Sequence, residues 1–383
     1  MKVVIVGAGL AGLRTAEALR DKGFDGEVVL VGDEVHQPYD RPPLSKHVLR
    51  GERPPMYLRP EQEYAALDLD LRLGATATGL EGHTLLTSQG PVPFDHLVIA
   101  TGATPRRLPG APGHVLRTLD DCQRLAPVLV PGARIAIIGA GLIGCEVAAS
   151  ARAKEVEVHL VDLLSKPLVR VLGDIVADRL VDLHTEHGVH LHLGTGVVTV
   201  TGTATASRVE LADGTVLEVD AVLEAMGVVP ATDWLAGSAL AVADGVLCDQ
   251  QGQAADRVWA VGDVARWDDG VGGSFRREHW TSATEQAAVV AAAILGEAEP
   301  ITTPPYWWSD QYDLKLQGLG EAHPDDDVEI VTAGPRRRQL ALYSRSGRLS
   351  GVVGFSAGPL VFKLRDAVSN GAPLDEVRAL LEI

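Results

Sequence analysis

The sequence predicts an α/β fold in which one local structure, a buried strand followed by a glycine-rich turn and a helix, begins two separate βαβ units. The first turn is the run GAGLAG from Gly7 to Gly12, and the second is GAGLIG from Gly139 to Gly144. Each turn follows an apolar run with the composition of a strand and precedes an alanine-rich amphipathic stretch. Strands that alternate with helices in this way are typical of a parallel sheet.

Glycines at this spacing are typical of a turn that binds a dinucleotide. The first glycine permits the tight turn, the second lets a pyrophosphate approach the backbone, and the third lets the helix pack against the strand. The phosphates then lie at the positive N-terminus of the helix. We therefore expect one dinucleotide at Gly7, Gly9, Ala11 and Gly12, and a second at Gly139, Gly141, Leu142, Ile143 and Gly144.

An acidic residue follows each turn after roughly 20 residues, at the end of the next strand, where it can bind ribose hydroxyls. The run EVVLVGDE supplies Asp33 and Glu34, and the run VEVHLVD supplies Asp162. One such motif alone is weak support, because any single glycine can serve a turn and any single aspartate a solvated strand end. Two copies in register predict two bound dinucleotides, and the simplest chemistry that needs both is hydride transfer from a nicotinamide to a flavin.

Length and composition are those of a multidomain enzyme. The 383 residues suggest two or three domains. The net charge of −17 argues against nucleic acid or an anionic membrane as a partner. No apolar run reaches the roughly 20 residues of a membrane helix, and the chain enters its first strand directly. We therefore expect a protein without a signal peptide that stays in the cytoplasm.

The three cysteines, Cys122, Cys145 and Cys248, are not spaced as metal ligands or disulfide partners. We expect no metal site, and the odd number fits a reducing compartment. Cys145 lies in the first turn of the second helix, where the helix dipole favours a thiolate. The alternative, a small residue packed against the strand, is the favoured interpretation.

Composition shifts along the chain predict an interrupted domain. A stretch rich in proline and glycine at residues 105–113 is typical of a crossover linker, and Asp213-Gly214 of a hairpin turn. The run DRVWAVGD then returns a buried strand with the pattern of the first unit. We predict a first domain of residues 1–107 and 233–303, a second of residues 108–232, and a third of residues 304–383 with two or three strands and a helix near residues 374–381.

The ordered motifs resemble a known family over the whole chain. They are GAGLAG, PYDRPPLSK, LVIATGATPR, IIGAGLIGCEVAA, VWAVGDVAR, REHWTSATEQA and YWWSDQYDLKLQGLG. This set is similar to the flavoprotein reductases that pass electrons from NADH to the ferredoxins of cytochrome P450s or Rieske-type oxygenases, of the rhodocoxin, putidaredoxin and biphenyl-dioxygenase reductase type. The resemblance implies two Rossmann-like domains of the glutathione-reductase type, the FAD domain being split by the NADH domain, and a C-terminal α/β domain.

The same resemblance implies roles for individual residues. Lys46 would lie beside the flavin N5 edge, where a cation stabilises the charge of a reduced flavin. Glu146 would pair with Lys46, its alternative role being to complement the helix dipole. Trp308 would pack near the isoalloxazine or in the core. The remaining FAD contacts would be Arg41, Ala77, Thr101, Gly102, Arg106, Gly262, Asp263, Glu278, His279 and Trp280.

Charge at the ribose predicts NADH as the coenzyme. Asp162 would bind the 2′-hydroxyl and repel a 2′-phosphate, and Leu163 and Leu164 offer no arginine clamp. Lys166 lies close enough in sequence to reach a phosphate. Gly227 is kept from the nicotinamide motif of the family, but the preceding Glu-Ala-Met departs from it.

The electron acceptor is the least determined feature. Disulfide reductases need a redox cysteine near the flavin, and the corresponding run here is Leu44-Ser45-Lys46. A ferredoxin is the expected partner, with an oxygenase beyond it. Because ferredoxins are usually acidic, docking requires a local basic face. Candidates are Arg336, Arg337, Arg338, Arg345 and Arg348, or Arg41, Arg50, Arg53 and Arg59, although a solvated arginine-rich turn is an equal alternative for the first group.

Two other functions stay open. One is a redox-gated binding module that resembles apoptosis-inducing factor, and the other is the reductase portion of a nitrite reductase, although the chain lacks cluster-binding cysteines. The oligomeric state is open between a monomer and a weak dimer.

Overall fold

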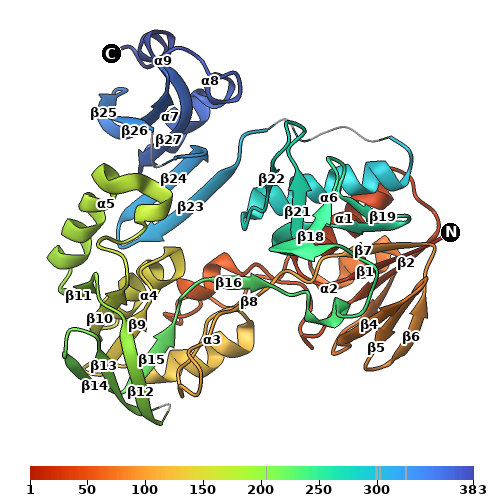
Figure 1. The fold of residues 1–383 in the computed structure, drawn as a ribbon, viewed down its shortest axis with the longest axis horizontal. Coiled ribbons are helices and arrows are strands. Elements are labelled where there is room, and N and C mark those ends of the chain that lie inside the picture. The colour runs from red at the N-terminus through yellow and green to blue at the C-terminus, as the bar shows by residue number, and fades with distance from the viewer. Residues whose placement is uncertain (204, 298–300, 302, 324–325) are drawn as a thin grey trace. The chain divides into compact units, whose positions relative to one another are not determined.

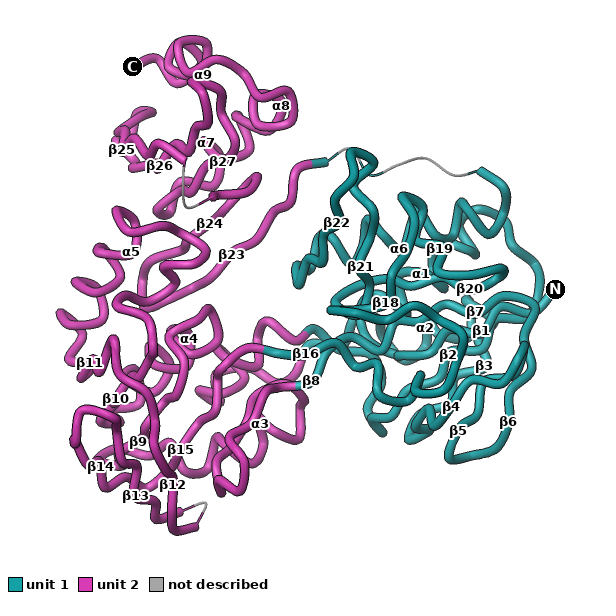
Figure 2. Tube along the Cα trace, in the orientation of Figure 1, with its two compact units in different colours: residues 1–40, 56–104, 228–303 teal, residues 41–55, 105–227, 304–383 magenta. Residues whose placement is uncertain are grey.

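The computed structural model describes residues 1–203, 205–297, 301, 303–323 and 326–383, and Figures 1 and 2 show its course. The chain forms two compact units, and each unit collects three segments that are far apart in the sequence. Unit 1 comprises Met1–Asp40, Met56–Thr104 and Val228–Thr303. Unit 2 comprises Arg41–Pro55, Pro105–Gly227 and Pro304–Ile383. The three-domain boundaries expected from the sequence stay a prediction.

The centre of unit 1 is a six-stranded sheet with the order β19-β20-β7-β1-β2-β3. All neighbours in it are parallel except the edge strand β19, which runs antiparallel to β20. The buried apolar residues of β1 give this sheet its core. Its strands are β1 (Lys2–Val6), β2 (Glu27–Val31), β3 (Leu69–Arg72), β7 (His96–Ile99), β19 (Gln253–Ala255) and β20 (Val258–Ala260).

Two long helices of unit 1, α1 (Leu10–Asp21) and α6 (Trp280–Ile294), lie side by side (Figure 1). A three-stranded antiparallel sheet of β4 (Ala77–Glu81), β5 (Thr84–Thr87) and β6 (Gly90–Pro93) packs into the same core through Leu85 and Val92. The remaining elements of the unit are α2 (Glu61–Tyr64), β17 (Val242–Ala243), β18 (Gly245–Cys248), β21 (Ala265–Asp268) and β22 (Ser274–Phe275), while β8 (Ala103–Pro105) and β16 (Val228–Pro230) lie where the chain passes between units.

Unit 2 repeats the plan of unit 1 in its middle segment. A parallel sheet with the order β11-β10-β9-β15 carries a three-stranded antiparallel sheet on one face, and the two share an apolar core. The strands are β9 (Arg134–Ile138), β10 (Glu157–Asp162), β11 (Val189–Leu193), β12 (Val197–Thr203), β13 (Ala206–Leu211), β14 (Val216–Val219) and β15 (Ala221–Glu224). The helices are α3 (Leu119–Leu125), α4 (Leu142–Arg152) and α5 (Val169–Glu186).

The last segment of unit 2 is a five-stranded antiparallel sheet with the order β23-β24-β27-β26-β25. The sequence predicted two or three strands here, so that prediction was too low. Ser346 and Gly347 both have positive φ and form a two-residue turn that divides residues 338–355 into two strands. The elements are β23 (Tyr306–Gln311), β24 (Leu314–Gly320), β25 (Asp327–Ala333), β26 (Arg338–Arg345), β27 (Arg348–Phe355), α7 (Gly358–Lys363), α8 (Arg365–Ser369) and α9 (Leu374–Leu381).

The hairpin of β23 and β24 is anchored on α5 by an aromatic turn residue. Tyr312 follows β23 with φ of 55°, a left-handed conformation that usually favours glycine. Its ring stacks on His187 at a centroid distance of 3.6 Å, and its hydroxyl lies 3.0 Å from Nδ1 of His184. These two contacts compensate for the unfavourable backbone and fix the end of the hairpin against the helix.

None of the helices within the described ranges has the length and apolar character needed to cross a membrane.

The buried His184 predicts a loss of stability in acid. Its side chain is fully buried, and burial lowers its pKa from 6.5 to about 4. Below pH 6.5 this histidine is therefore protonated in the unfolded chain, whereas in the folded chain it stays neutral down to about pH 4. The unfolding free energy consequently decreases as the pH is lowered through this range. Between pH 7.5 and pH 5 this group should remove about 2 kcal/mol of the unfolding free energy.

Urea unfolding of the purified protein at the two pH values measures this loss. The variant His184→Gln should lose about 2 kcal/mol less than the wild type, whereas His83→Gln, at an exposed histidine, should match it. An equal loss in wild type and His184→Gln would show that this group does not titrate as described.

Candidate functional site

The two glycine-rich turns have the same backbone hydrogen bonds. The amide of Gly7 donates to the carbonyl of Val31 at 2.7 Å, and the amide of Gly139 donates to that of Val161 at 2.7 Å. Each turn therefore ties the end of the first strand of its sheet to the end of the neighbouring strand. The helix that follows begins directly after the second glycine in both copies.

The glycines differ in what a side chain would meet. A Cβ on Gly12 would lie 1.9 Å from the carbonyl oxygen of Gly7, and a Cβ on Gly144 would lie 1.9 Å from that of Gly139. Gly9 and Gly141 instead have no atom within 4 Å of such a Cβ among the described residues. The third glycine thus serves close packing, whereas the second leaves open space against the backbone at the helix N-terminus.

The acidic residue of the second turn is already engaged with the backbone. Asp162 accepts from the amide of Ala140 at 2.6 Å and from that of Leu164 at 2.8 Å. A carboxylate has about four acceptor positions, so two remain for ribose hydroxyls. In unit 1, Glu34 accepts from the hydroxyl of Tyr39 at 2.5 Å, while Asp33 next to it is exposed.

The surroundings of Asp162 bear on the choice of coenzyme. The ammonium of Lys166 lies 2.8 Å from Asp178 and 3.2 Å from Asp174, so two carboxylates already neutralise it. Leu163 is 77% exposed and Ile143 is 41% exposed, which leaves apolar surface beside the turn. Among Ile143, Leu163 and Lys166, no side chain therefore offers an unpaired positive charge to a 2′-phosphate.

Several predicted residues of unit 1 gather around the first turn. A Cβ on Gly262 would lie 3.0 Å from that of Ala11, and the amide of Gly262 donates to the buried Gln286 at 2.7 Å. Asp263 follows Gly262 in a short 3₁₀ turn. These contacts place the end of the return strand β20 next to the start of α1.

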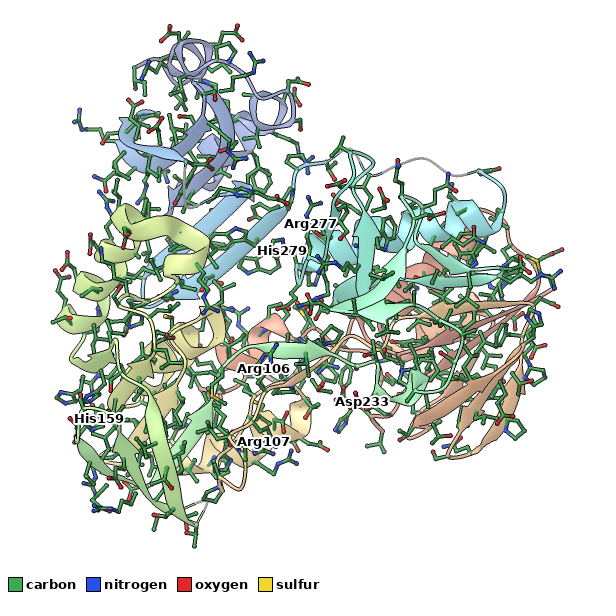
Figure 3. All side chains as sticks on the ribbon, viewed as in Figure 1. Arg106, Arg107, His159, Asp233, Arg277 and His279 are labelled. Carbon is green, nitrogen blue, oxygen red and sulfur yellow. The ribbon has the colours of Figure 1, made fainter. Side chains whose placement is uncertain are left out.

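The segment before α6 supplies three further predicted residues, and Figure 3 labels His279 on it. Trp280 begins α6 and donates from Nε1 to Asp40 at 2.9 Å. The centroid of its ring lies 5.9 Å from the guanidinium carbon of Arg14. His279 is the N-cap residue of that helix, and Glu278 accepts from Arg276 at 2.7 Å. The side chain of Glu278 is thus committed to an ion pair.

Three other predicted contacts have structural partners. Thr101 donates to the carbonyl of Ala231 at 2.8 Å, and Gly102 beside it has φ of 70°. Ala77 begins β4 and packs on the core of unit 1. In unit 2, the amide of Arg106 donates to the carbonyl of Gly227 at 2.9 Å, and Figure 3 labels its side chain, which is exposed.

Unit 2 contains a buried ion pair between Lys46 and Glu146, the pair expected from the resemblance. The ammonium Nζ lies 2.7 Å from Oε2 of Glu146, and the two residues are 6% and 3% exposed. Ser45 donates to the same Oε2 at 2.5 Å, and Ser309 of β23 donates to Oε1 at 2.7 Å. Three donors from two segments thus converge on one carboxylate, which suits its ionised form.

The segment that carries Lys46 is fixed on α4 by further bonds. Ser150 of α4 donates to the carbonyl of Ser45 at 2.7 Å, and Arg50 donates to Ser150 at 3.2 Å. Arg41 donates to the carbonyl of Arg117 at 2.5 Å. These contacts explain why Arg41–Pro55 belongs to unit 2 although the chain on both sides of it belongs to unit 1.

Trp308 lies on the other face of β23 from Ser309. Side chains alternate along the strand, with Trp307, Ser309 and Gln311 buried and Tyr306 and Trp308 half-buried. Trp308 stacks on Tyr306 at a centroid distance of 6.0 Å. The same strand therefore supports the Glu146 carboxylate with one face and presents an aromatic ring from the other.

Comparison with known proteins assigns the chain to a family. Residues 1–287 match the family model described as pyridine nucleotide-disulphide oxidoreductase, and residues 306–380 match that of a reductase C-terminal domain. The chain belongs to the pyridine nucleotide-disulphide oxidoreductase family. FAD and NAD(H) are the cofactors of this family, and the open space at Gly9 and at Gly141 fits two dinucleotides.

Relatives of this oxidoreductase include proteins named as ferredoxin reductases. Rhodocoxin reductase of Rhodococcus erythropolis is 37% identical over 84% of this chain and 78% of the relative. The ferredoxin reductase component of chlorobenzene dioxygenase from Cupriavidus sp. (strain PS12) is 38% identical over 99% of this chain and 93% of the relative. One chain of the solved covalent putidaredoxin reductase–putidaredoxin complex superposes on this chain with a TM-score of 0.91 at 31% identity. The match covers 100% of this chain and 99% of that chain.

The cysteines of this oxidoreductase are unsuited to disulfide chemistry. All three are buried and free. Burial raises the pKa of Cys122 to about 11 and that of Cys248 to about 12, and it raises the pKa of Cys145 further still. The packed interpretation of Cys145 is therefore confirmed. Within the described residues there is also no group of three or more side chains able to hold a metal ion.

Sequence reasoning missed two residues of the Glu146 cluster that the structure brings together. Ser45 and Ser309 both lie inside motifs that carried the resemblance, PYDRPPLSK and YWWSDQYDLKLQGLG. Their neighbours Lys46 and Trp308 drew attention because charged and aromatic side chains have obvious roles near a flavin. The alternation along β23 was the available signal, since it places Ser309 and Gln311 on one face.

The open second glycine of each turn predicts two separable effects. Gly9 and Gly141 have φ of −91° and −78°, which other residues adopt freely. Gly141→Val should fold and keep its flavin but bind NADH at least about tenfold more weakly, because the side chain occupies the space for the pyrophosphate. Gly9→Val should fold without retaining FAD. Titration with NADH and the visible spectrum measure both effects.

The third glycines provide the matched comparison. Gly144→Ala should lower the unfolding free energy by at least about 2 kcal/mol, because its Cβ meets a carbonyl oxygen. Wild-type affinity for NADH in Gly141→Val would contradict the assignment of the second turn.

Proposed function

We propose that this chain is an FAD-dependent ferredoxin reductase that accepts hydride from NADH and passes single electrons to a [2Fe–2S] ferredoxin, which feeds a cytochrome P450 or a Rieske-type oxygenase. The observation that carries the proposal is the duplicated turn with open backbone at the second glycine, one copy in each parallel sheet. Two dinucleotide sites on one chain suit transfer of reducing equivalents between two cofactors. Two proteins that match nearly the whole chain are named as the ferredoxin reductase component of chlorobenzene dioxygenase and as a putidaredoxin reductase in complex with putidaredoxin.

The donor is assigned to the second turn. Gly139, Gly141 and Gly144 would receive the pyrophosphate of NADH at the N-terminus of α4, and Asp162 the adenine ribose. The negative charge of Asp162 disfavours a 2′-phosphate, and Lys166 is occupied by two aspartates. These features support NADH over NADPH.

FAD supplies the conversion of a two-electron hydride transfer into two one-electron transfers. The first turn and the residues gathered around it in unit 1 would bind this cofactor. Lys46 would hold a fixed positive charge beside its N5 edge, and Glu146 would keep that ammonium in place. Trp308 would cover the ring system with the half-buried face of β23.

The exit of electrons does not pass through a thiol in this proposal. Ser45 stands beside Lys46 where a disulfide reductase would need a cysteine, and its hydroxyl is bound to Glu146. The cysteines of the chain are buried with raised pKa values. A one-electron protein acceptor is the outlet that fits these residues.

Among the candidate basic patches, the turn before β26 is favoured for docking the ferredoxin. Arg50 is paired with Glu52, Arg59 with Glu17 and Glu63, and Arg345 with Asp326, so their charges are neutralised locally. Arg336, Arg337 and Arg338 are exposed and have no acidic partner among the ion pairs of the described residues. We propose this turn as a contact for an acidic partner. We also propose a cytoplasmic location, with which three buried and unpaired cysteines are compatible.

Anaerobic stopped-flow absorption tests the whole reaction. The yellow protein should be bleached rapidly by NADH, and an oxidised [2Fe–2S] ferredoxin should then restore the flavin spectrum. Bleaching without reoxidation would refute the acceptor, and absence of bleaching would refute the donor. A slow reduction that leaves a long-lived charge-transfer band would favour the binding module that resembles apoptosis-inducing factor.

Coenzyme choice gives a separate prediction. Asp162→Asn should reduce the preference for NADH over NADPH by about tenfold, because the charge that repels a 2′-phosphate is lost. Lys166→Ala should change the preference by less than about twofold, because two carboxylates already hold this ammonium. The ratio of kcat/KM for flavin reduction by the two coenzymes is the measurement. A larger change in Lys166→Ala than in Asp162→Asn would contradict the assignment.

A further inference from the structure

The two oxygens of Glu146 are held from different parts of the chain. Oε2 accepts from Ser45 and from Lys46, which both belong to the segment Arg41–Pro55. Oε1 accepts from Ser309 of β23 at 2.7 Å. A glutamate side chain has three rotatable bonds, so fixing one oxygen alone leaves the carboxylate free to turn. The bond from Ser309 supplies the second point that defines its plane.

The hydroxyl of Ser309 is itself oriented by Gln311. Both side chains are fully buried, and Nε2 of Gln311 donates to Oγ of Ser309 at 3.2 Å. Because this bond uses an acceptor position of the hydroxyl, the Ser309 proton is directed toward Glu146. The hydrogen bonds from Gln311 to Ser309 and from Ser309 to Glu146 therefore form a chain that ends on a charged acceptor. Hydrogen bonds in such a chain polarise one another.

The strand that carries these residues has a fixed position against the helices of unit 2. The turn after β23 is anchored on α5 through Tyr312, which stacks on His187 and bonds to His184. Gln311 also raises the pKa of His184 against the effect of burial. With its end held in this way, β23 keeps one register, and Ser309 stays opposite Glu146.

We propose that Ser309 is a positioning residue of the reductase: through Glu146 it fixes the ammonium of Lys46 in the place where that charge acts on the flavin. This inference rests on the proposed function for its effect on catalysis. Its structural part does not, because the cluster of Ser45, Lys46, Glu146, Ser309 and Gln311 lies within unit 2 alone. The strand β23 then contributes residues to the proposed flavin site, with Ser309 on one face and Trp308 on the other.

The test compares Ser309→Ala with Ser309→Thr, which keeps a hydroxyl and suits a strand. Ser344→Ala is the matched control, since Ser344 is a buried serine of β26 in the same sheet. Competitive acetylation by acetic anhydride, read by mass spectrometry, measures the reactivity of Lys46 in the protein as purified, and the other six of the seven lysines serve as internal references. Glu146→Gln gives the reactivity of Lys46 without its partner charge.

In Ser309→Ala, Lys46 should be acetylated at least about threefold faster than in the wild type, because the carboxylate that holds its ammonium is no longer fixed. In the FAD-loaded protein, the rate constant of flavin reduction by NADH should fall about tenfold, with the NADH dissociation constant changed less than about twofold. Ser309→Thr and Ser344→Ala should match the wild type in both measurements. Gln311→Met should shift the labelling of Lys46 in the same direction as Ser309→Ala.

A wild-type labelling rate of Lys46 in both Ser309→Ala and Gln311→Met would overturn the inference, whatever happens to thermal stability. An equal rise in Ser344→Ala would also overturn it, by showing a general loosening of the sheet. If the wild-type protein fails to reduce a ferredoxin, the proposed function fails, while the labelling comparison still decides whether Ser309 positions Lys46 through Glu146.

Discussion

The buried ion pair of Lys46 and Glu146 is the interaction that joins three segments of unit 2 around the proposed site. Removing a lysine and a glutamate from water costs several kcal/mol for each ion, and only good geometry with further hydrogen bonds repays that cost. Here Lys46, Ser45 and Ser309 all point to one acceptor, and each sits on a segment with its own anchors. The helix α4, the segment Arg41–Pro55 and the strand β23 are joined at this point, so a change in any one of them is transmitted to the ammonium of Lys46.

The duplicated turn gives each parallel sheet the same backbone arrangement, and we propose that each copy binds one dinucleotide. Gly12 and Gly144 are required because any larger residue would place its Cβ 1.9 Å from a carbonyl oxygen, whereas a Cβ at Gly9 or Gly141 would meet open space among the described residues. The two turns thus separate the demands of folding from those of binding. In the proposed sites, Asp162 and the paired Lys166 would shape the ribose environment of one, and Glu34 with Tyr39 would shape that of the other.

Features with strong local signals were predictable from the sequence. Glycine spacing predicted both turns, and the order of motifs led to the ion pair of Lys46 and Glu146, which the structure contains. The roles of Ser309 and Gln311 were not predictable in this way, because a serine becomes informative only when its partner, 163 residues away, is known. The five strands of the last segment were undercounted because two tight turns divide it further: Ser346 and Gly347 separate β26 from β27, and Tyr312, whose left-handed backbone is accompanied by stacking on His187, separates β23 from β24. Likewise, the pairing of Lys166 with Asp174 and Asp178 depends on the fold of α5.

The central proposal is that FAD, when bound, has its N5 edge beside the Lys46–Glu146 pair. A crystal structure of the oxidised protein with FAD bound tests it most directly. We predict that Nζ of Lys46 lies within about 3.5 Å of the flavin N5 while it keeps its contact with Glu146. A flavin whose N5 edge lies more than about 6 Å from Lys46, with the ion pair intact, would contradict this claim and reduce the pair to a structural support.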